Sequence, residues 1–283
     1  MVIPPLALAA VLAGAVLHAA WNVGIRSRPD RHVSTAELLL GAAALAVVCL
    51  PFLPPPLPAS YLFLVASTPI HVVYFSLLAE AYARVDIALA YPVMRGVAPT
   101  LTALVAVGFL GERLGPKGWF GVLLISAGVA LMARHSRAQG ERPALFIALG
   151  NAVLIAGYTV VDALGARTSG SPVAYVLWLL LLTALPACAI LLRGQRWRGF
   201  VHADNVPAAA LRGLGGGLFS VASYSLALWA LTRAPIGPIA ALRETSTAFS
   251  VLLAWLWLGE WPSARRWIAV ATIAAGAIAL RLQ

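Results

Sequence analysis

The chain has few charged residues and almost no cysteine. Only 11% of its 283 residues are Asp, Glu, Lys or Arg, whereas 61% are hydrophobic. A soluble protein needs more charge on its surface to stay dispersed, so a soluble domain of this length is excluded. The two cysteines, Cys49 and Cys188, both lie within apolar runs, and a disulfide framework is therefore not indicated.

Catalytic and nucleotide-binding motifs are lacking as well. The sequence contains no G-x-x-x-x-G-K-[ST] loop, no H-E-x-x-H and no G-x-S-x-G, and its five histidines are scattered. We therefore expect no enzyme, no cofactor and no metal site. ATP is not expected to be a direct energy source within this chain.

The formal net charge of +10 is distributed as short clusters of Arg and Lys between apolar runs. This pattern is typical of a multi-pass membrane protein and argues against a nucleic-acid partner. No basic residue precedes the first apolar run, so we expect that run to be a retained helix and not a cleaved signal peptide.

Ten apolar runs approach the length of about 20 residues that a helix needs to cross a bilayer. The expected helices are 4–25, 36–53, 61–82, 87–110, 118–133, 144–164, 173–192, 208–231, 236–258 and 267–280. The fifth and tenth are short, and span only if flanking Lys and Arg side chains reach the headgroups. The sequence predicts an all-α polytopic protein of the inner (plasma) membrane, with short connections and its function within the bundle.

The second half of the chain repeats the first at one constant offset. Gly111–Glu112 corresponds to Gly259–Glu260, and Arg95 corresponds to Arg243. The predicted halves are residues 1–135 and 141–283, with five helices each. An odd number of helices inverts the second half relative to the first, as in many secondary transporters that hold substrate in a central cavity between two repeats.

Four segments carry a family resemblance: LHAAWN at 17–22, the Leu-Gly-Glu ends of the fourth and ninth helices, and GYTVVDALGAR at 157–167. With them the chain resembles the drug/metabolite transporter superfamily, in its ten-helix EamA-type branch, over nearly its whole length. The resemblance implies a basket of helices in which the first, third, fourth, sixth, eighth and ninth line the cavity, while the fifth and tenth support it from outside. It also implies export or uptake of small polar metabolites such as amino acids.

The orientation of the chain is given differently by charge and by resemblance. The loops after the odd-numbered helices carry roughly twelve Lys and Arg against about five on the other side, which places both termini outside. The resemblance implies termini in the cytoplasm. The loop after the second helix, PFLPPPLPAS, also lacks the basic residue common in such relatives.

Charged side chains inside apolar helices give the sharpest functional signal. Four of them together, Arg95, Arg243, Glu244 and Glu80, would cost about 10 kcal/mol if they were neither paired nor hydrated. Arg95 and Arg243 form a predicted clamp for an anionic or zwitterionic substrate, because a guanidinium binds a carboxylate through two hydrogen bonds. The alternative is a structural ion pair of Arg95 with Glu80 or Glu244, and the two interpretations agree if substrate competes for the pair.

Polar and aromatic residues on neighbouring helices complete the predicted substrate site. One face of the first helix carries His18, Trp21 and Asn22, whose alternative role is helix packing. The other predicted substrate-binding residues are Tyr74, Tyr91, Tyr158 and Tyr224. Tyrosines of membrane helices also serve as interfacial anchors, which is the alternative for these four.

Proton coupling has three candidates, Glu80, Asp162 and His18. Glu80 is placed for a salt bridge to Arg84 instead, and Asp162 for the loop at Arg167. Asp86 and Glu37 are predicted helix caps, and His71 a packing residue.

The predicted function is secondary transport by alternating access, most simply export, of an amino-acid-like, anionic or zwitterionic metabolite. Two other classes are a membrane scaffold or partner subunit, and a lipid-modifying enzyme. The expected partners are a small-molecule substrate, the lipid bilayer and protons. A monomer is expected, with a homodimer as the alternative.

Overall fold

The computed structural model of this chain contains helices and no strand within the residues that it describes. These are residues 3–26, 30–84, 87–133, 141–194, 196–197, 200 and 206–282; only the backbone is described at 23–26, 31, 81–84, 87–91, 141–145 and 258.

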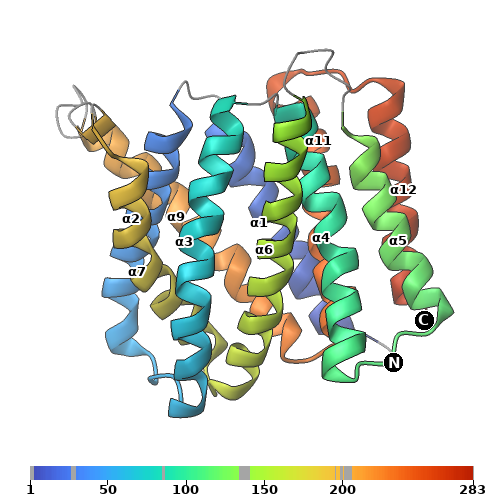
Figure 1. Cartoon of the computed structure of the whole chain (residues 1–283), viewed down its shortest axis with the longest axis horizontal. Coiled ribbons are helices and arrows are strands. Elements are labelled where there is room, and N and C mark those ends of the chain that lie inside the picture. Colours follow the sequence, from blue (N-terminus) through green and yellow to red (C-terminus); the bar gives the residue numbers. More distant parts are fainter. Residues whose placement is uncertain are drawn as a thin grey trace.

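In the part of the chain that the structure describes, ten helical spans form the bundle (Figure 1). Their bounds are α1 Pro5–Arg26, α2 Arg31–Cys49, α3 Tyr61–Arg84, α4 Ile87–Leu110, α5 Pro116–Leu131, α6 Glu141–Thr168, α7 Pro172–Leu191, α9 Val206–Leu231, the pair α10 Ile236–Arg243 and α11 Thr245–Leu258, and α12 Ala264–Arg281. Within the described residues, eight spans are long and apolar enough to cross a membrane. The other two are α5 and α12, which the sequence also predicts to be short.

The ninth span departs from the single helix that the sequence predicts for 236–258. It consists of α10 and α11, which meet at Glu244. The Glu244 N–H donates to the carbonyls of Ala241 and Leu242, which tightens the turn. The Thr245 hydroxyl also donates to the Leu242 carbonyl. Hydroxyl side chains that bond to preceding carbonyls disturb the regular helix ladder. The bend therefore puts Arg243 and Glu244 at an irregular point inside the bundle.

The two halves run in opposite directions through the bundle. In Figure 1, α1 starts at the lower face and α6 starts at the upper face, while both chain ends lie at the lower face. The packing repeats when the halves are exchanged: α1 on α9 corresponds to α6 on α3, and α1 on α11 to α6 on α4. Three helices of the first half pack on their own repeat counterparts: α2 on α7, α5 on α12, and α4 on α10. The fold is thus two inverted five-helix repeats, as predicted.

Glycines allow the closest contacts between helices of different halves. A Cβ atom on Gly41 of α2 would lie 1.9 Å from the Gly213 carbonyl oxygen of α9, and one on Gly121 of α5 would lie 3.0 Å from the Gly276 oxygen of α12. Backbones that approach this closely leave no room for a side chain, which is how small residues join membrane helices.

One predicted helix cap is wrong. The N-cap of α2 is Asp30, which accepts hydrogen bonds from the N–H groups of His32 at 2.9 Å and Val33 at 3.2 Å. Since α2 begins before the predicted start, Glu37 lies in its second turn and instead accepts from Arg212 of α9 at 3.2 Å. Asp86 lies outside the described residues.

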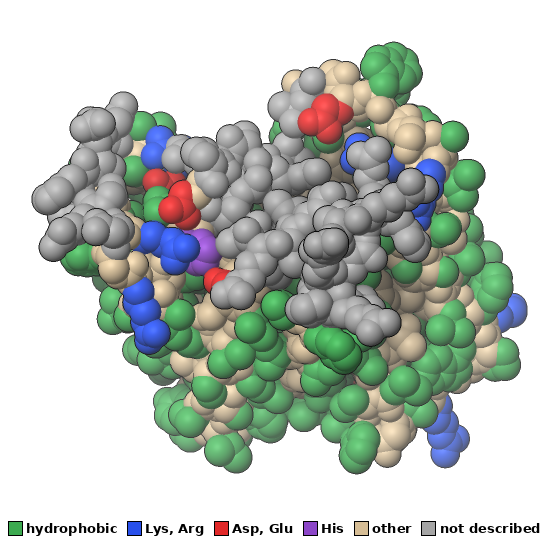
Figure 2. Space-filling model, turned by 45° about the horizontal axis from the view of Figure 1, so that its top comes forward, with side chains coloured by type: hydrophobic (Ala, Val, Ile, Leu, Met, Phe, Trp, Pro, Cys, Tyr) green, Lys and Arg blue, Asp and Glu red, His purple; other side chains and the backbone are tan. Residues whose placement is uncertain are grey.

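Charge and hydrophobicity separate on the molecular surface. Figure 2 shows most of the visible charged side chains along the upper rim, while hydrophobic side chains cover the wall below. The apolar wall suits lipid, and the rim suits headgroups and water.

Candidate functional site

A buried ion pair joins the two halves at the centre of the candidate site. The Nε atom of Arg95 in α4 lies 2.8 Å from Oε2 of Glu244, and each residue is only 3% exposed. The atoms do not align as a hydrogen bond, so charge holds the pair together. On the far side of the guanidinium, Nη2 of Arg95 lies 3.3 Å from Nε2 of His18 in α1. The alternative that Arg95 pairs with Glu244 is therefore present in the structure.

The second predicted clamp residue has a different environment. Arg243 ends α10 and is half-buried, with its guanidinium carbon 5.1 Å from the centre of the Tyr224 ring of α9. This is cation–π geometry. Arg243 has no carboxylate ion-pair partner within the described part of the chain. Glu244, which pairs with Arg95, also attracts Arg243 electrostatically, but no ion pair to Arg243 forms among the described residues.

Asp162 of α6 is the focus of a second polar cluster. Its carboxylate is fully buried and accepts hydrogen bonds from the hydroxyls of Tyr224 and, at 3.1 Å, Tyr175 of α7. Nε2 of His71 in α3 lies 3.7 Å from the same carboxylate. Asp162 therefore faces the bundle interior. The alternative that it reaches the loop at Arg167 is wrong, because Arg167 bonds to other groups.

His71 does more than pack. Its Nδ1 atom lies 3.1 Å from the Ser67 hydroxyl, its ring centre lies 4.3 Å from that of Tyr158, and its Nε2 faces Asp162. The expectation of a pure packing residue is wrong, since the partner comes from a different half of the chain.

An aromatic wall joins the two clusters. The Tyr158 ring lies 5.3 Å from Tyr74 and 6.4 Å from Tyr224, so three predicted residues meet. Trp21 packs edge-on against His18 at 4.9 Å, and its buried Nε1 has no hydrogen-bond partner among the described residues. Asn22 donates to the His18 carbonyl within its own helix at 3.0 Å. The side chain of Tyr91 lies outside what the structure describes.

Glu80 lies apart from this site, near the end of α3. Its Oε2 atom lies 3.7 Å from Nε2 of His32, and its side chain is 36% exposed. The side chain of Arg84, its predicted partner, is outside the described residues. The structure thus brings His18 and Asp162 into the candidate site and leaves Glu80 at its rim.

Sequence reasoning missed two contributors. Tyr175 gives no signal in a helix rich in leucine. His71 has Ser67 at helical spacing, but its contact with Asp162 joins α3 to α6 and cannot be read from either segment alone. Ser246 and Thr247 were not missed, since helical spacing in the sequence already predicts a polar stripe of these residues with Arg243. Their hydroxyls, just beyond the bend, are buried without a hydrogen-bond partner in the described residues.

The combined site draws side chains from α1, α3, α4, α6, α7, α9 and the α10–α11 bend. Apart from α7, which contributes Tyr175, these are the first, third, fourth, sixth, eighth and ninth spans, the set that lines the cavity in the resembled superfamily. No group of His, Cys, Asp and Glu that suits a metal ion occurs among the described residues. Guanidinium, carboxylate, indole and hydroxyl groups equip the site to bind a polar molecule.

The model of the EamA-like transporter family matches residues 5–134 and 142–282. The chain belongs to this family, within the drug/metabolite transporter superfamily. It is therefore a membrane transporter by family. A crystal structure of a protein with 22% sequence identity has the same fold, with a TM-score of 0.73 over 98% of this chain and 97% of that one.

Curated relatives of this EamA-like transporter include the spermidine export protein MdtI of Salmonella paratyphi B and of Salmonella newport. Each is 36% identical over 58 residues, which is 20% of this chain. The match spans 53% of each relative's own length, about half.

Proposed function

We propose that this EamA-like transporter is a secondary exporter of an amino-acid-like, anionic or zwitterionic metabolite and works by alternating access. One observation carries the proposal: Arg243 lies half-buried within a membrane span, without a carboxylate partner among the described residues, beside the closed pair of Arg95 and Glu244. An uncompensated cation in a membrane span is costly, and such residues usually mark a substrate path. A bound carboxylate would supply the missing charge.

Substrate binding follows from the geometry of these groups. A carboxylate binds the fork of Arg243 through two charge-assisted hydrogen bonds, and the Tyr224 ring keeps the guanidinium in place. An ammonium group of the same substrate competes with Arg95 for Glu244. Trp21 Nε1 and the hydroxyls of Ser246 and Thr247 are available for the remaining polar atoms.

Asp162 is the preferred proton site in this proposal. It is fully buried and holds two tyrosine hydroxyls, one of which belongs to the Tyr224 ring under Arg243. Protonation of Asp162 would therefore change the position of the ring on which the substrate-binding guanidinium lies. His18 touches Arg95 and is the second candidate, while the rim position of Glu80 beside His32 favours an ion pair.

A polyamine is a second candidate substrate, because the curated relatives are spermidine exporters. Asp162 and Glu244 lie among the rings of Tyr158, Tyr224 and Trp21, and carboxylates with aromatic faces bind organic cations. In this case Glu244 and Asp162 bind the substrate, and Arg243 opposes it. The two candidates therefore predict opposite effects of removing Arg243.

The substrate class is tested by efflux from cells that overproduce the chain, challenged with toxic amino-acid analogues and with spermidine. Arg243→Ala should lower amino-acid efflux about 10- to 100-fold, the value of one charge-assisted fork. Arg233→Ala is the matched control, since Arg233 lies 5.0 Å from the Trp229 ring but is exposed at the lower face. Unchanged amino-acid efflux by Arg243→Ala at equal expression would reject the proposed clamp, and faster spermidine efflux would favour the polyamine.

The proton site is tested in vesicles with Asp162→Asn, which keeps the shape but removes the titratable group. Concentrative transport driven by a pH gradient should be lost, whereas exchange of substrate across the membrane at equal pH should remain. Glu80→Gln is the control and should keep both activities. Gradient-driven transport that survives in Asp162→Asn rules out this role.

A further inference from the structure

At the lower face of the bundle, Glu112, two residues beyond the end of α4, contacts the start of α10. Its carboxylate accepts hydrogen bonds from the N–H of Ile236, at 2.8 and 2.9 Å to its two oxygens, and from the N–H of Gly237 at 3.4 Å. These N–H groups begin α10, where the helix has no partner of its own for them. A first-half carboxylate thus caps a second-half helix.

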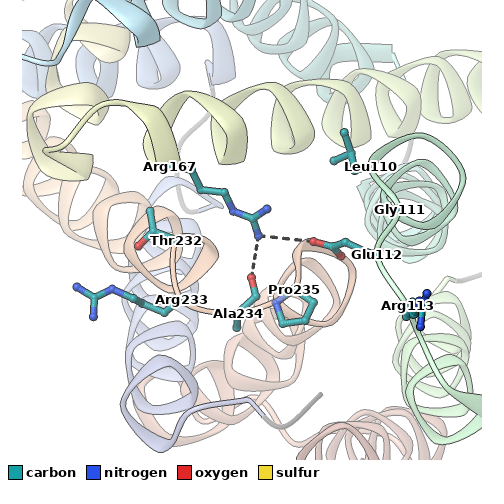
Figure 3. A pocket seen from close by; sticks show the side chains of 9 residues that line it. All are labelled: Leu110, Gly111, Glu112, Arg113, Arg167, Thr232, Arg233, Ala234 and Pro235. Carbon is teal, nitrogen blue, oxygen red and sulfur yellow. Dashed lines mark hydrogen bonds and ion pairs between the residues drawn. The ribbon is translucent and has the colours of Figure 1, made fainter.

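Arg167 at the end of α6 stabilises the same contact between Glu112 and the start of α10, which we call the Glu112 corner. Its guanidinium donates to the carbonyls of Leu231 at 2.9 Å and Ala234 at 3.0 Å, and lies 3.5 Å from Glu112. Figure 3 shows Arg167 pointing between Glu112 and Ala234. The corner lines a pocket of about 520 Å³, which also includes Arg113 and Arg233.

The helix that Glu112 caps leads directly to the candidate substrate site. α10 has eight residues, about 12 Å of rise, and all from Ile236 to Leu242 are buried. A Cβ on Gly237 would lie 3.0 Å from the Ala103 Cβ of α4, so this end of α10 is tightly packed. The opposite end carries Arg243 and Glu244. A displacement at the Glu112 end therefore moves both site residues.

The inverted repeat contains the same corner a second time, at the upper face. Gly111 and Gly259 have φ values of +67° and +68°, and the N–H groups of Glu112 and Glu260 donate to the equivalent carbonyls of Ala106 and Ala254. The backbones therefore match. The side chains do not, because Glu260 is exposed and its carboxylate makes no hydrogen bond or ion pair within the described residues.

We infer that Glu112 and Glu260 are alternate closing caps of the two faces. With Glu112 on the start of α10, the lower face is shut and α10 holds Arg243 and Glu244 in the observed positions. In the opposite state Glu112 releases α10, and Glu260 caps the start of α4, which is the repeat equivalent of α10 and carries Arg95. Glu112 is thus a positioning residue for the substrate site. This inference rests on the proposed transport by alternating access.

The inference is tested by the distance between spin labels at positions 113 and 233, which lie in different halves on the lower face. The protein is the full chain in nanodiscs, with Cys49 and Cys188 replaced by Ala. Glu112→Ala should raise the population with a long distance at least tenfold. Glu260→Ala, the matched control at the same backbone corner, should not raise it. Glu112→Gln keeps the size and replaces Glu112→Ala if the latter does not fold.

Two results would overturn the inference: an unchanged distance distribution in a folded Glu112 variant, or an equal shift in the Glu260 variant. A merely structural cap would lower thermal stability without moving the distance. The measurement needs no substrate, so it separates failure of the caps from failure of the proposed substrate class. Once a transported substrate is known, Glu112→Ala should lower its turnover rate, and this fold-change should be at least five times the fold-change in KM.

Discussion

Arg95 and Arg243 occupy equivalent positions in the two halves, yet only one of them is neutralised. Arg95 is buried against Glu244, and Arg243 is half-buried over a tyrosine ring. The residue that follows explains the difference: it is Glu244 in the second half and Gly96 in the first. A Cβ at Gly96 would lie 3.1 Å from the Ser126 carbonyl oxygen of α5, so any side chain there would be crowded against α5.

The repeat thus fixes the position of each arginine, whereas the residue that follows it, Gly96 or Glu244, differs between the halves and decides which arginine is neutralised. Two arginines share one nearby carboxylate. In the proposed function, the pair is a structural element that substrate opens, and the guanidinium of Arg243 is the anchor. An inverted repeat that kept both carboxylates would have no charge left to recognise an anion.

The largest effect is expected from removing the paired arginine. Arg95→Ala leaves the carboxylate of Glu244 buried and uncompensated, which should lower the free energy of unfolding by about 3–5 kcal/mol. Thermal unfolding of the purified protein in detergent measures this. The double variant Arg95→Ala with Glu244→Ala should regain most of the loss, and Arg243→Ala alone should cost far less. Equal stability of the two single arginine variants would erase the distinction drawn here.

The next effect concerns the glycine that stands where the other half has glutamate. Gly96→Ala forces α4 away from α5 and should cost about 1–3 kcal/mol of stability. Gly108→Ala on the same helix is the control, because nothing lies within 4 Å of its Cβ position. That variant should be neutral or slightly stabilising, since alanine favours helix. A harmless Gly96→Ala would show that α4 has room for a larger residue.

A smaller effect is expected from changing the shape of the free cation. Arg243→Lys keeps the charge but loses the planar fork, so KM for a carboxylate substrate should rise about tenfold. Turnover at saturating substrate should change less. Concentration-dependent uptake into vesicles separates the two constants. A KM equal to that of the unchanged protein would mean that charge alone suffices.

The smallest effect belongs to an exposed ion pair that also joins the halves. Arg212 of α9 lies 3.2 Å from Glu37 of α2, but its side chain is 40% exposed. Solvent screens such pairs, so Arg212→Ala should change stability by less than about 1 kcal/mol. The same melting experiment as for Arg95→Ala gives the direct contrast. A loss as large as that of Arg95→Ala would show that burial is not what separates the two pairs.

Much of the fold can be predicted because membrane helices depend on local apolar length. The ten spans, the short α5 and α12, and the repeat of Gly-Glu corners all follow from residues close in sequence. The bend at Glu244 does not, since it depends on whether the hydroxyls of Thr245 and its neighbours bond to carbonyls. The start of α2 was missed because its polar first turn, from Arg31, lies outside the apolar run.

The site is predictable as a set of residues and less so as a set of pairs. Charges at Arg95, Arg243 and Glu244 stand out from the apolar background. Which carboxylate meets Arg95 depends on how α4 packs on the α10–α11 bend, and the sequence left Glu80 and Glu244 equally open. The contact of Glu112 with the start of α10 likewise joins distant segments that share no local pattern.

The contacts between the halves have a further consequence for ancestry. The largest of them either join a helix to its own equivalent, as in α5 with α12, or have a twin elsewhere in the bundle, as α1 on α9 has in α6 on α3. Such self-complementary surfaces are those of a twofold dimer. A protein of half the length could therefore bury the same surfaces as a homodimer whose two subunits are inserted in the bilayer in opposite orientations. Fusion of two such genes would then free each copy to diverge, as at Gly96 and Glu244.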